Sequence, residues 1–220
     1  YALFLPNSCT VPGPLTAVIP TTVHDMVDRN MDILLASQSP RRRELLRQIG
    51  VDFVVLPVAI DETPLGGETP EACVQRLALQ KARTGRATQS AAGPLPVMGA
   101  DTLVVAGDAV LGKPAGRGEA LEMLQLLSGS THRVITAVAL AGEHEAVCMT
   151  TSHVTFRTLT ARECEAYWET GEPRDKAGAY AVQGLAAMFI TRLEGSYSGV
   201  VGLPLYETAT LLQEFGIRLL

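Results

Sequence analysis

The chain has 220 residues, of which 47% are hydrophobic and 19% are charged, and its formal net charge at pH 7 is -5. This composition is typical of a globular domain and excludes a disordered chain. The negative charge argues against a broad nucleic-acid-binding face, while a compact anion in a local basic pocket stays compatible with it. No apolar run approaches the ~18 residues that a membrane-spanning helix needs. We therefore expect neither a nucleic-acid partner nor a membrane partner.

The four cysteines, Cys9, Cys73, Cys148 and Cys164, are widely spaced and include no C-x-x-C pair. This spacing indicates neither a zinc site nor a disulfide framework. Reduced thiols are typical of a reducing compartment, so we predict a cytoplasmic protein.

Residues 1–30 differ from the rest of the chain, because prolines interrupt every apolar stretch and Arg29 is the only Lys or Arg. A secretory signal has a charged start and an unbroken apolar core, and this segment has neither. We predict a flexible N-terminal extension over 1–30 and one folded domain over 31–220. An ordered functional arm is the alternative for the first segment.

From Met31 onward, strands and helices alternate. We expect strands at 32–36, 52–56, 96–106, 132–141, 146–157 and 187–193, and helices at 40–49, 70–88, 119–127, after Thr160 and at 204–215. The pattern predicts a mixed α/β architecture. One continuous domain with two lobes is our interpretation of its organisation.

A basic turn follows the first expected strand, with the sequence Ser37-Gln38-Ser39-Pro40-Arg41-Arg42-Arg43. Pro40 suits the first position of a helix because its φ is already helical. Free N–H groups at that end attract anions, whereas cations are disfavoured there unless an anion is bound. We interpret the turn as a phosphate site, and a solvated basic turn is the alternative.

Carboxylates occur in two places where chemistry is possible. Asp61 and Glu62 follow the second expected strand, and such a pair can bind a hard divalent cation, although loop acids are more often solvated. Asp101 interrupts an apolar strand within Gly99-Ala100-Asp101-Thr102. A buried carboxylate needs a cation, a metal or hydrogen-bond donors, and such an environment suits a general base. A structural acid is the alternative for Asp101.

Three further segments contain lysines and other polar residues that are capable of chemistry. Lys81 lies four residues after Leu77, on the otherwise apolar face of its helix, although a lysine on such a face can also extend to solvent without a function. Lys113 stands between Gly112 and Pro114, where a constrained backbone could hold a phosphate-binding charge, although such tripeptides are common turns. Asp175, Lys176 and Gln183 form an acid, a cation and an amide within about two helical turns, which a plain charged helix start would also explain.

Together these segments resemble the Maf family of nucleoside triphosphate pyrophosphatases over residues 32 to about 216. The resemblance rests on S-x-S-P-R-R, an acid-bearing loop, G-A-D-T, G-K-P, D-K-A-G-x-Y-x-x-Q-G and V-G-L-P, in this order. Each motif is weak by itself, and their order and spacing make the resemblance specific. It implies an elongated mixed sheet flanked by helices, with two lobes around a central cleft, similar to the inosine-triphosphatase fold.

The resemblance also implies an activity, namely hydrolysis between the α and β phosphates with Mg²⁺ or Mn²⁺ as cofactor. Asp101 would accept the proton of the attacking water, and Glu62 and Asp101 would hold the metal. The substrate would be contacted by Ser37, Arg41, Arg42, Lys81, Thr102, Lys113, Asp175, Lys176 and Gln183. A homodimer is compatible with the family, although no interface is legible in the sequence.

The residues Arg41, Thr102 and Gln183 resemble the branch of the family that acts on dTTP and UTP. A glutamine amide can pair with the donor and acceptor edge of uracil or thymine. The alternatives are 7-methyl-GTP as the substrate, and a non-catalytic nucleotide sensor or an interaction protein that inhibits cell division. The presence of both Asp101 and Glu62 disfavours a non-catalytic protein.

Overall fold

The structure is a computed structural model that describes residues 31–89 and 95–219. The residues from Met31 onward form one compact unit. Residues 1–30 lie outside the described part, so the extension predicted there stays a prediction. Among the described helices, none is both long and apolar enough to cross a membrane.

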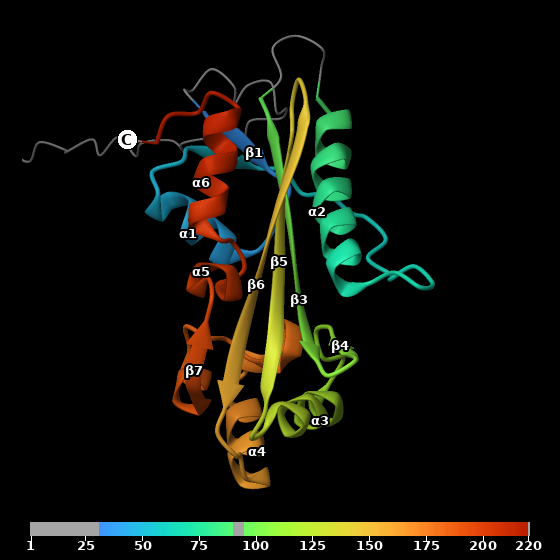
Figure 1. Ribbon diagram of the computed structural model, residues 1–220, viewed down its shortest axis with the longest axis vertical. Helices are drawn as coiled ribbons and strands as arrows, with labels where there is room; N and C mark the ends of the chain where they lie inside the picture. Colours follow the sequence, from blue (N-terminus) through green and yellow to red (C-terminus); the bar gives the residue numbers. More distant parts are fainter. Residues whose placement is uncertain (1–30, 90–94, 220) are drawn as a thin grey trace, which may run out of the picture. The chain divides into compact units, whose positions relative to one another are not determined.

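The described residues form one open, seven-stranded sheet with helices on both faces (Figure 1). The strands are β1 (Ile33–Leu35), β2 (Phe53–Val55), β3 (Val97–Ala106), β4 (Ala109–Leu111), β5 (Thr131–Ala141), β6 (Glu145–Phe156) and β7 (Ile190–Glu194). The helices are α1 (Pro40–Gln48), α2 (Pro70–Ala87), α3 (Arg117–Leu127), α4 (Ala161–Glu169), α5 (Tyr197–Val201) and α6 (Leu205–Glu214). Short 3-10 turns lie at Glu172–Asp175, Ala177–Ala179 and Leu185–Phe189.

The sheet has the order β2-β1-β3-β5-β6-β7, and β4 pairs with β3. β1 runs parallel to β2 and β3, and all other pairs are antiparallel. On the same side of β3, β1 pairs only with Val97 and Met98, and β4 only with Val104 to Ala106. Residues 99–103 therefore form a free edge in the middle of β3, between the part that pairs with β1 and the part that pairs with β4.

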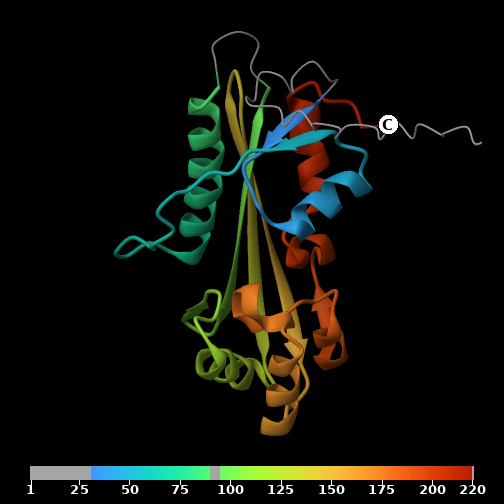
Figure 2. The ribbon, with the colours of Figure 1, turned by 180° about the vertical axis from the view of Figure 1, so that it is seen from behind.

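The three long strands β3, β5 and β6 join two groups of elements (Figures 1 and 2). Around one half of these strands, α1 and α6 cover one face and α2 covers the other. Around the other half, β4, α3 and α4 form a separate core with the lower ends of the strands. This arrangement confirms the predicted mixed α/β sheet with two lobes.

Local signals explain where the helices begin. The Thr69 hydroxyl accepts a hydrogen bond of 3.2 Å from the N–H of Ala72 at the start of α2. At the start of α4, Thr160 and Glu163 form a capping box in which each side chain binds the other residue's backbone N–H. Such caps satisfy N–H groups that have no partner inside the helix. Both helix starts agree with the sequence-based expectation.

The chain after α4 differs from that expectation. The expected strand at 187–193 begins only at Ile190, because the Glu172 carboxylate accepts hydrogen bonds from the N–H groups of Leu185 and Ala186 and starts a 3-10 turn there. The segment around Asp175 is not a regular helix, since Gly178 and Ala179 have φ of 68° and 57°. Helix α5 was not expected from the sequence.

Candidate active site

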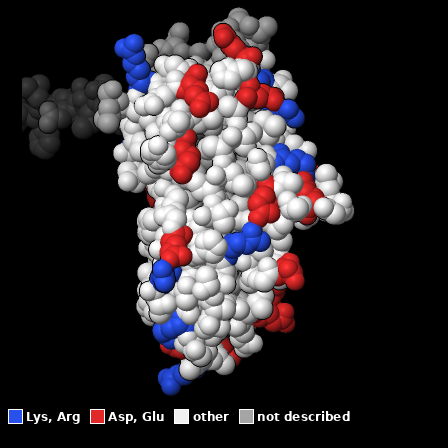
Figure 3. Space-filling view, in the orientation of Figure 1, with Lys and Arg blue, Asp and Glu red and all other residues white. Residues whose placement is uncertain are grey.

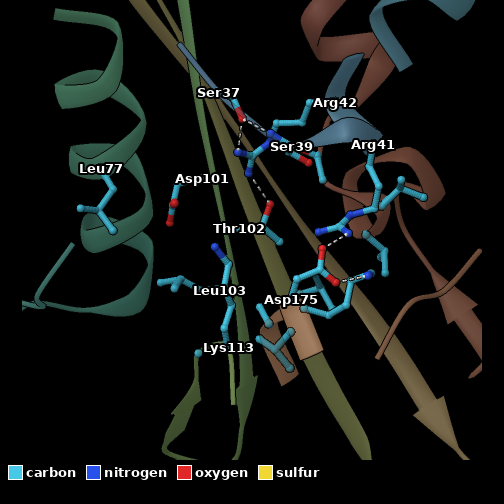
Figure 4. Close-up of a pocket in the computed structure, with 18 of the residues that line it drawn as sticks. Ser37, Ser39, Arg41, Arg42, Leu77, Asp101, Thr102, Leu103, Lys113 and Asp175 are labelled. Atoms are coloured by element: carbon cyan, nitrogen blue, oxygen red, sulfur yellow. Dashed lines mark hydrogen bonds and ion pairs between the residues drawn. The ribbon is translucent and has the colours of Figure 1, made fainter. Parts of the chain in front are cut away.

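A cleft of about 740 Å³ opens at the free edge of β3. Both lobes contribute to its lining, from Ala36 after β1 to Gly202 after α5. On the face in Figure 3, basic side chains lie singly among acidic ones. Inside the cleft, by contrast, cations from separate elements face the same space as Asp101 (Figure 4).

Lys81, Asp101 and Glu62 form an ionic cluster on the α2 side of the cleft. The Lys81 ammonium nitrogen lies 2.7 Å from Asp101 Oδ1 and 2.7 Å from Glu62 Oε1. The side chains of Lys81 and Asp101 are only 12% and 11% exposed, while that of Glu62 is 56% exposed. Two carboxylates from different elements thus converge on one cation.

Gly99 allows this cluster to form. A Cβ atom at Gly99 would lie 2.2 Å from the Ala78 carbonyl oxygen and 2.7 Å from the Ala82 nitrogen, both in the backbone of α2. Only glycine lets β3 approach the helix so closely. The close approach brings Lys81, on α2, within hydrogen-bond distance of Asp101, two residues after Gly99.

The pKa of Glu62 reflects its charged neighbours. Partial burial tends to raise this pKa, but the hydrogen bond and charge of Lys81, together with the charges of Lys113 and Arg42, bring it below its ordinary value. Glu62 is therefore ionised at neutral pH. Its neighbour Asp61 turns away and accepts a hydrogen bond of 2.9 Å from the Thr63 N–H, which shapes the loop.

Arg42 is the best-fixed cation of the site. Its Nε donates to the Gly202 carbonyl at 2.9 Å, and its two terminal nitrogens donate to Ser37 Oγ at 3.1 Å and Thr102 Oγ1 at 3.2 Å (Figure 4). Burial lowers the pKa of the guanidinium, and the charge of Asp101 opposes this effect. The guanidinium has five N–H groups, and three of them donate to these protein acceptors, which fixes its orientation. The other two N–H groups are available to bind a ligand.

Among the described residues, none accepts a hydrogen bond from the Ser37 hydroxyl. Its oxygen accepts hydrogen bonds from Arg42 at 3.1 Å and from the Ser39 N–H at 3.3 Å. A hydroxyl oxygen has two lone pairs, so both acceptor positions are used and the O–H remains as a donor. Ser37 lines the cleft, where this donor suits a phosphate oxygen.

A second ion-pair group crosses the cleft between the lobes. Arg41 of α1 lies 3.4 Å from Asp175, which is also paired with Lys176. Partial burial tends to raise the pKa of Asp175, but the hydrogen bonds and charges of Lys176 and Arg41 lower it overall. Lys176 also donates to the Glu172 carbonyl at 3.2 Å. The acid therefore stays charged and fixes the relative position of two cations.

Lys113 and Gln183 are the remaining candidates, and both line the cleft. Lys113 follows β4, and its side chain extends into the cleft below Asp101 (Figure 4). Gln183 is exposed and follows directly on Ala181 and Val182, two apolar residues of the lining. We use the term apolar wall for seven apolar lining residues, Val104, Val110, Val134, Ala177, Ala181, Val182 and Val200. An apolar wall with one amide suits a flat, partly polar ring.

The donor atoms on the α2 side fit a hard divalent cation. Within the described residues, no group of three or more His, Cys, Asp or Glu side chains could enclose a metal. Mg²⁺ is commonly held by one or two carboxylates together with substrate phosphates and water. Glu62 and Asp101, which already converge on the single charge of Lys81, supply that number of carboxylates.

Of the residues that the sequence analysis singled out, Asp61 does not line the cleft, whereas Glu62, Asp101 and all nine expected substrate contacts do. The sequence reasoning missed the Gly202 carbonyl and the Thr136 hydroxyl, which lies 3.0 Å from the Thr102 hydroxyl. In the sequence, Gly202 appeared only as one residue of the V-G-L-P motif, with no role of its own. Its φ of 129° is a conformation that favours glycine. Threonine is common in β-strands, so nothing in the sequence distinguished Thr136 from other strand residues.

Known proteins resemble this chain over most of its length. A relative from Alkalilimnicola ehrlichii, named dTTP/UTP pyrophosphatase, is 58% identical over 84% of this chain and 93% of its own length. Relatives with the same name from Pseudoalteromonas atlantica and Nitrosospira multiformis are 54% and 52% identical, covering 84% and 85% of this chain and 97% and 96% of their own lengths.

Solved structures resemble the chain less closely. A nucleoside-triphosphatase / dITP/XTP pyrophosphatase from Mycobacterium abscessus overlaps with 57% of this chain and 74% of its own, at 20% identity and a TM-score of 0.38. An overlap at that level decides neither fold nor function. The model of the family described as Maf-like protein, however, matches residues 32–215, which include the whole cleft. The chain belongs to the Maf-like protein family.

Proposed function

We propose that this chain hydrolyses nucleoside triphosphates, dTTP and UTP in particular, to the nucleoside monophosphate and pyrophosphate. The observation that supports this most strongly is the convergence of Asp101, Glu62 and Lys81 at one end of a cleft that also contains the fixed guanidinium of Arg42. The relatives named dTTP/UTP pyrophosphatase, at 52% to 58% identity, support the choice of substrate.

Asp101 is our candidate for the group that receives the proton of the attacking water. Its Oδ1 accepts a hydrogen bond from Lys81, and among the described residues no donor binds Oδ2, which is free to accept a proton. The water oxygen bonds to the α-phosphorus while the bond from that phosphorus to the α–β bridging oxygen breaks. The electron pair of that bond leaves with the pyrophosphate.

The cations compensate the charge of the substrate and of the leaving group. A triphosphate carries about four negative charges, and negative charge grows on the pyrophosphate as the bond breaks. Arg42 and the hydroxyl of Ser37 bind phosphate oxygens on one side of the cleft. Lys113 and Lys176 bind phosphate oxygens from the other lobe. Arg41, which is paired with Asp175, adds a further positive charge to the cleft.

Glu62 and Asp101 are the residues that would hold a divalent cation, Mg²⁺ or Mn²⁺. When bound, such an ion lowers the pKa of a coordinated water and neutralises phosphate charge. Lys81 contacts both carboxylates and keeps them close together in the absence of other cations. The depressed pKa of Glu62 keeps its carboxylate charged and ready to act as a ligand.

The pyrimidine ring would lie against the apolar wall beside Gln183. The Gln183 amide has both a donor and an acceptor, which match the alternating edge of uracil and thymine. Thr102 does not have a free hydroxyl for this purpose, because that hydroxyl is bound to Arg42 and Thr136. Thr102 therefore acts on the substrate through Arg42 rather than on the base.

Pyrophosphate release from a panel of nucleotides tests this proposal. The purified chain is incubated with Mg²⁺ or Mn²⁺ and dTTP, UTP, CTP, ITP or 7-methyl-GTP, and both products are quantified. We expect preference for dTTP and UTP, with equal amounts of monophosphate and pyrophosphate. Preference for 7-methyl-GTP or ITP would overturn the base assignment. Absence of turnover in a folded sample would favour a nucleotide sensor or an interaction protein.

A further inference from the structure

A row of threonines crosses the sheet beneath the cleft. Thr102 on β3 lies directly opposite Thr136 on β5, and Thr136 lies directly opposite Thr150 on β6. Residues directly opposite each other on neighbouring strands point to the same face of a sheet. Thr136, in the middle of the row, is 0% exposed, so its hydroxyl must find partners inside the protein.

The hydrogen bonds along this row can run in only one direction. Thr136 Oγ1 donates to the Gly199 carbonyl at 2.8 Å, because a carbonyl oxygen can only accept. Thr136 therefore has no second hydrogen for Thr102, so the Thr102 hydroxyl, 3.0 Å away, is the donor in that pair. The Thr102 oxygen is then oriented to accept from Arg42 at 3.2 Å.

The same row connects Arg42 to helix α5 at two points. Gly199 lies in α5 and accepts from Thr136, and Gly202, directly after α5, accepts from Arg42 Nε at 2.9 Å. A Cβ atom at Gly199 would lie 2.9 Å from Thr150 Oγ1, so this segment lies directly on the threonine row. The orientation of the guanidinium thus depends on a buried residue that does not line the cleft.

We infer that Thr136 is a positioning residue, whose hydroxyl orients Arg42 for binding the triphosphate through Thr102 and α5. The inference rests on the proposed function, since it gives Arg42 a phosphate to bind. Without the Thr136 hydroxyl, the Gly199 carbonyl loses its donor and the Thr102 hydroxyl loses its acceptor. Thr102 can then rotate its hydrogen toward Arg42, which also carries hydrogens, and the contact between them is lost.

The test compares Thr136→Val with Thr150→Val. Both changes replace a hydroxyl by a methyl in the same row, but among the described residues the buried Thr150 hydroxyl has no hydrogen-bond partner. Turnover of UTP and binding of inorganic tripolyphosphate by calorimetry are measured in the full chain. We expect Thr136→Val to lower kcat/KM and weaken tripolyphosphate binding by about tenfold or more, and Thr150→Val to change neither by more than about twofold.

A double-mutant cycle distinguishes an effect through Arg42 from a general loss of packing around Thr136. In an Arg42→Lys background the shared contacts are already lost, so adding Thr136→Val has little further effect on kcat/KM. Thr136→Ser retains the hydroxyl and is expected to restore both readouts. Additive effects of Thr136→Val and Arg42→Lys would overturn the inference, as would equal behaviour of Thr136→Val and Thr150→Val.

Two readouts separate this inference from the proposed function. A wild-type chain that binds tripolyphosphate but hydrolyses no nucleotide contradicts the proposed function, and the binding data then decide the role of Thr136. A wild-type chain that does not bind tripolyphosphate contradicts the inference itself. Where Thr136→Val does not fold, the comparison of Thr136→Ala with Thr136→Ser isolates the hydroxyl, and equal binding by these two variants overturns the inference.

Discussion

Lys81 lies on the face of α2 that packs against the sheet, among residues such as Ala78 and Ala82 that are fully buried. A lysine on such a face commonly extends its ammonium group to solvent. Here the group instead ends between Asp101 and Glu62. Removing an ammonium from water is costly unless carboxylates compensate it, so the three residues depend on one another for their position.

The substitution Asp101→Asn tests the role of the buried acid. The amide has the shape of the carboxyl but cannot accept a proton from water, so we expect kcat to fall by about 10²- to 10⁴-fold. The fold is retained, because Lys81 keeps Glu62 as a partner. Steady-state rates with UTP and the melting temperature are measured. The exposed Asp108→Asn is the matched control, and near-normal turnover of Asp101→Asn would remove Asp101 from the mechanism.

The substitution Gln183→Glu tests base recognition. The change removes the amide donor at the rim of the cleft, and a lost hydrogen bond of this kind costs about 1–3 kcal/mol. We expect kcat/KM for UTP to fall by about tenfold relative to that for 7-methyl-GTP, with little effect on tripolyphosphate binding. Equal losses for UTP and 7-methyl-GTP would show that Gln183 does not recognise the base.

At the scale of elements, the contact between α2 and β3 decides the geometry of the ionic cluster. The substitution Gly99→Ala places a Cβ against the backbone of α2, which cannot yield in the way that a side chain can. We expect a loss of about 1–3 kcal/mol in the free energy of unfolding and a larger fractional loss of activity, because Lys81 moves away from Asp101. Urea denaturation and UTP turnover are measured together.

Gly118→Ala is the matched control for this change. Gly118 lies in α3, where a Cβ would meet nothing within 4 Å, so alanine is expected to stabilise the helix by up to about 1 kcal/mol. A Gly99→Ala variant as stable and as active as this control would contradict the close-approach argument.

Strand β5 also contains a buried histidine that makes stability depend on pH. Burial lowers the pKa of His132 from 6.5 to about 4, and its Nε2 lies 2.8 Å from the Tyr180 hydroxyl. The folded protein therefore excludes a proton that the unfolded chain binds. The contribution to stability is fully present above pH 6.5 and is lost as the pH falls from 6.5 through about 4.

We expect a loss on the order of 3 kcal/mol from this residue between pH 7 and pH 4, because one pKa unit corresponds to about 1.4 kcal/mol. The free energy of unfolding is measured by urea denaturation at both pH values, for the wild type and for His132→Gln. The difference between the two proteins in its change with pH gives the contribution of His132. We expect the pH dependence to be smaller in His132→Gln than in the wild type. An identical slope for His132→Gln and the wild type would contradict this account.

At the scale of the whole molecule, the site depends on contacts between distant parts of the chain. Arg42 binds Gly202, 160 positions later, and Arg41 pairs with Asp175, 134 positions later. All residues of the site lie between Ser37 and Gly202, within the region that matches the family model. The unit that begins at Met31 therefore contains every residue that lines the cleft.

A chain shortened to begin at Met31 tests whether this unit is sufficient. We expect kcat/KM for UTP within about twofold of the full chain and a melting temperature within about 2 °C, because the site and its supporting cores lie in this unit. Turnover and thermal unfolding of the two chains are compared directly. A loss of turnover with retained folding would assign residues 1–30 a functional role.

The amino-acid sequence by itself determined the alternation of strands and helices, the helix starts at Thr69 and Thr160, and the set of polar residues that line the cleft. These are local properties, since periodicity, caps and motifs are all read within a few residues. The late 3-10 turns were not predictable in this way, because the Glu172 carboxylate that starts one of them lies 13 residues from Leu185.

Only the tertiary structure decided how the selected residues act. The sequence could not tell whether Lys81 extends to solvent or binds Asp101, because the answer depends on how closely β3 approaches α2 at Gly99. It also could not indicate that Thr102 holds Arg42 through Thr136, since that pairing comes from the register between β3 and β5. The register of a strand is specified by which of its faces is buried, and the burial of β3 and β5 depends on elements that lie far away in the sequence.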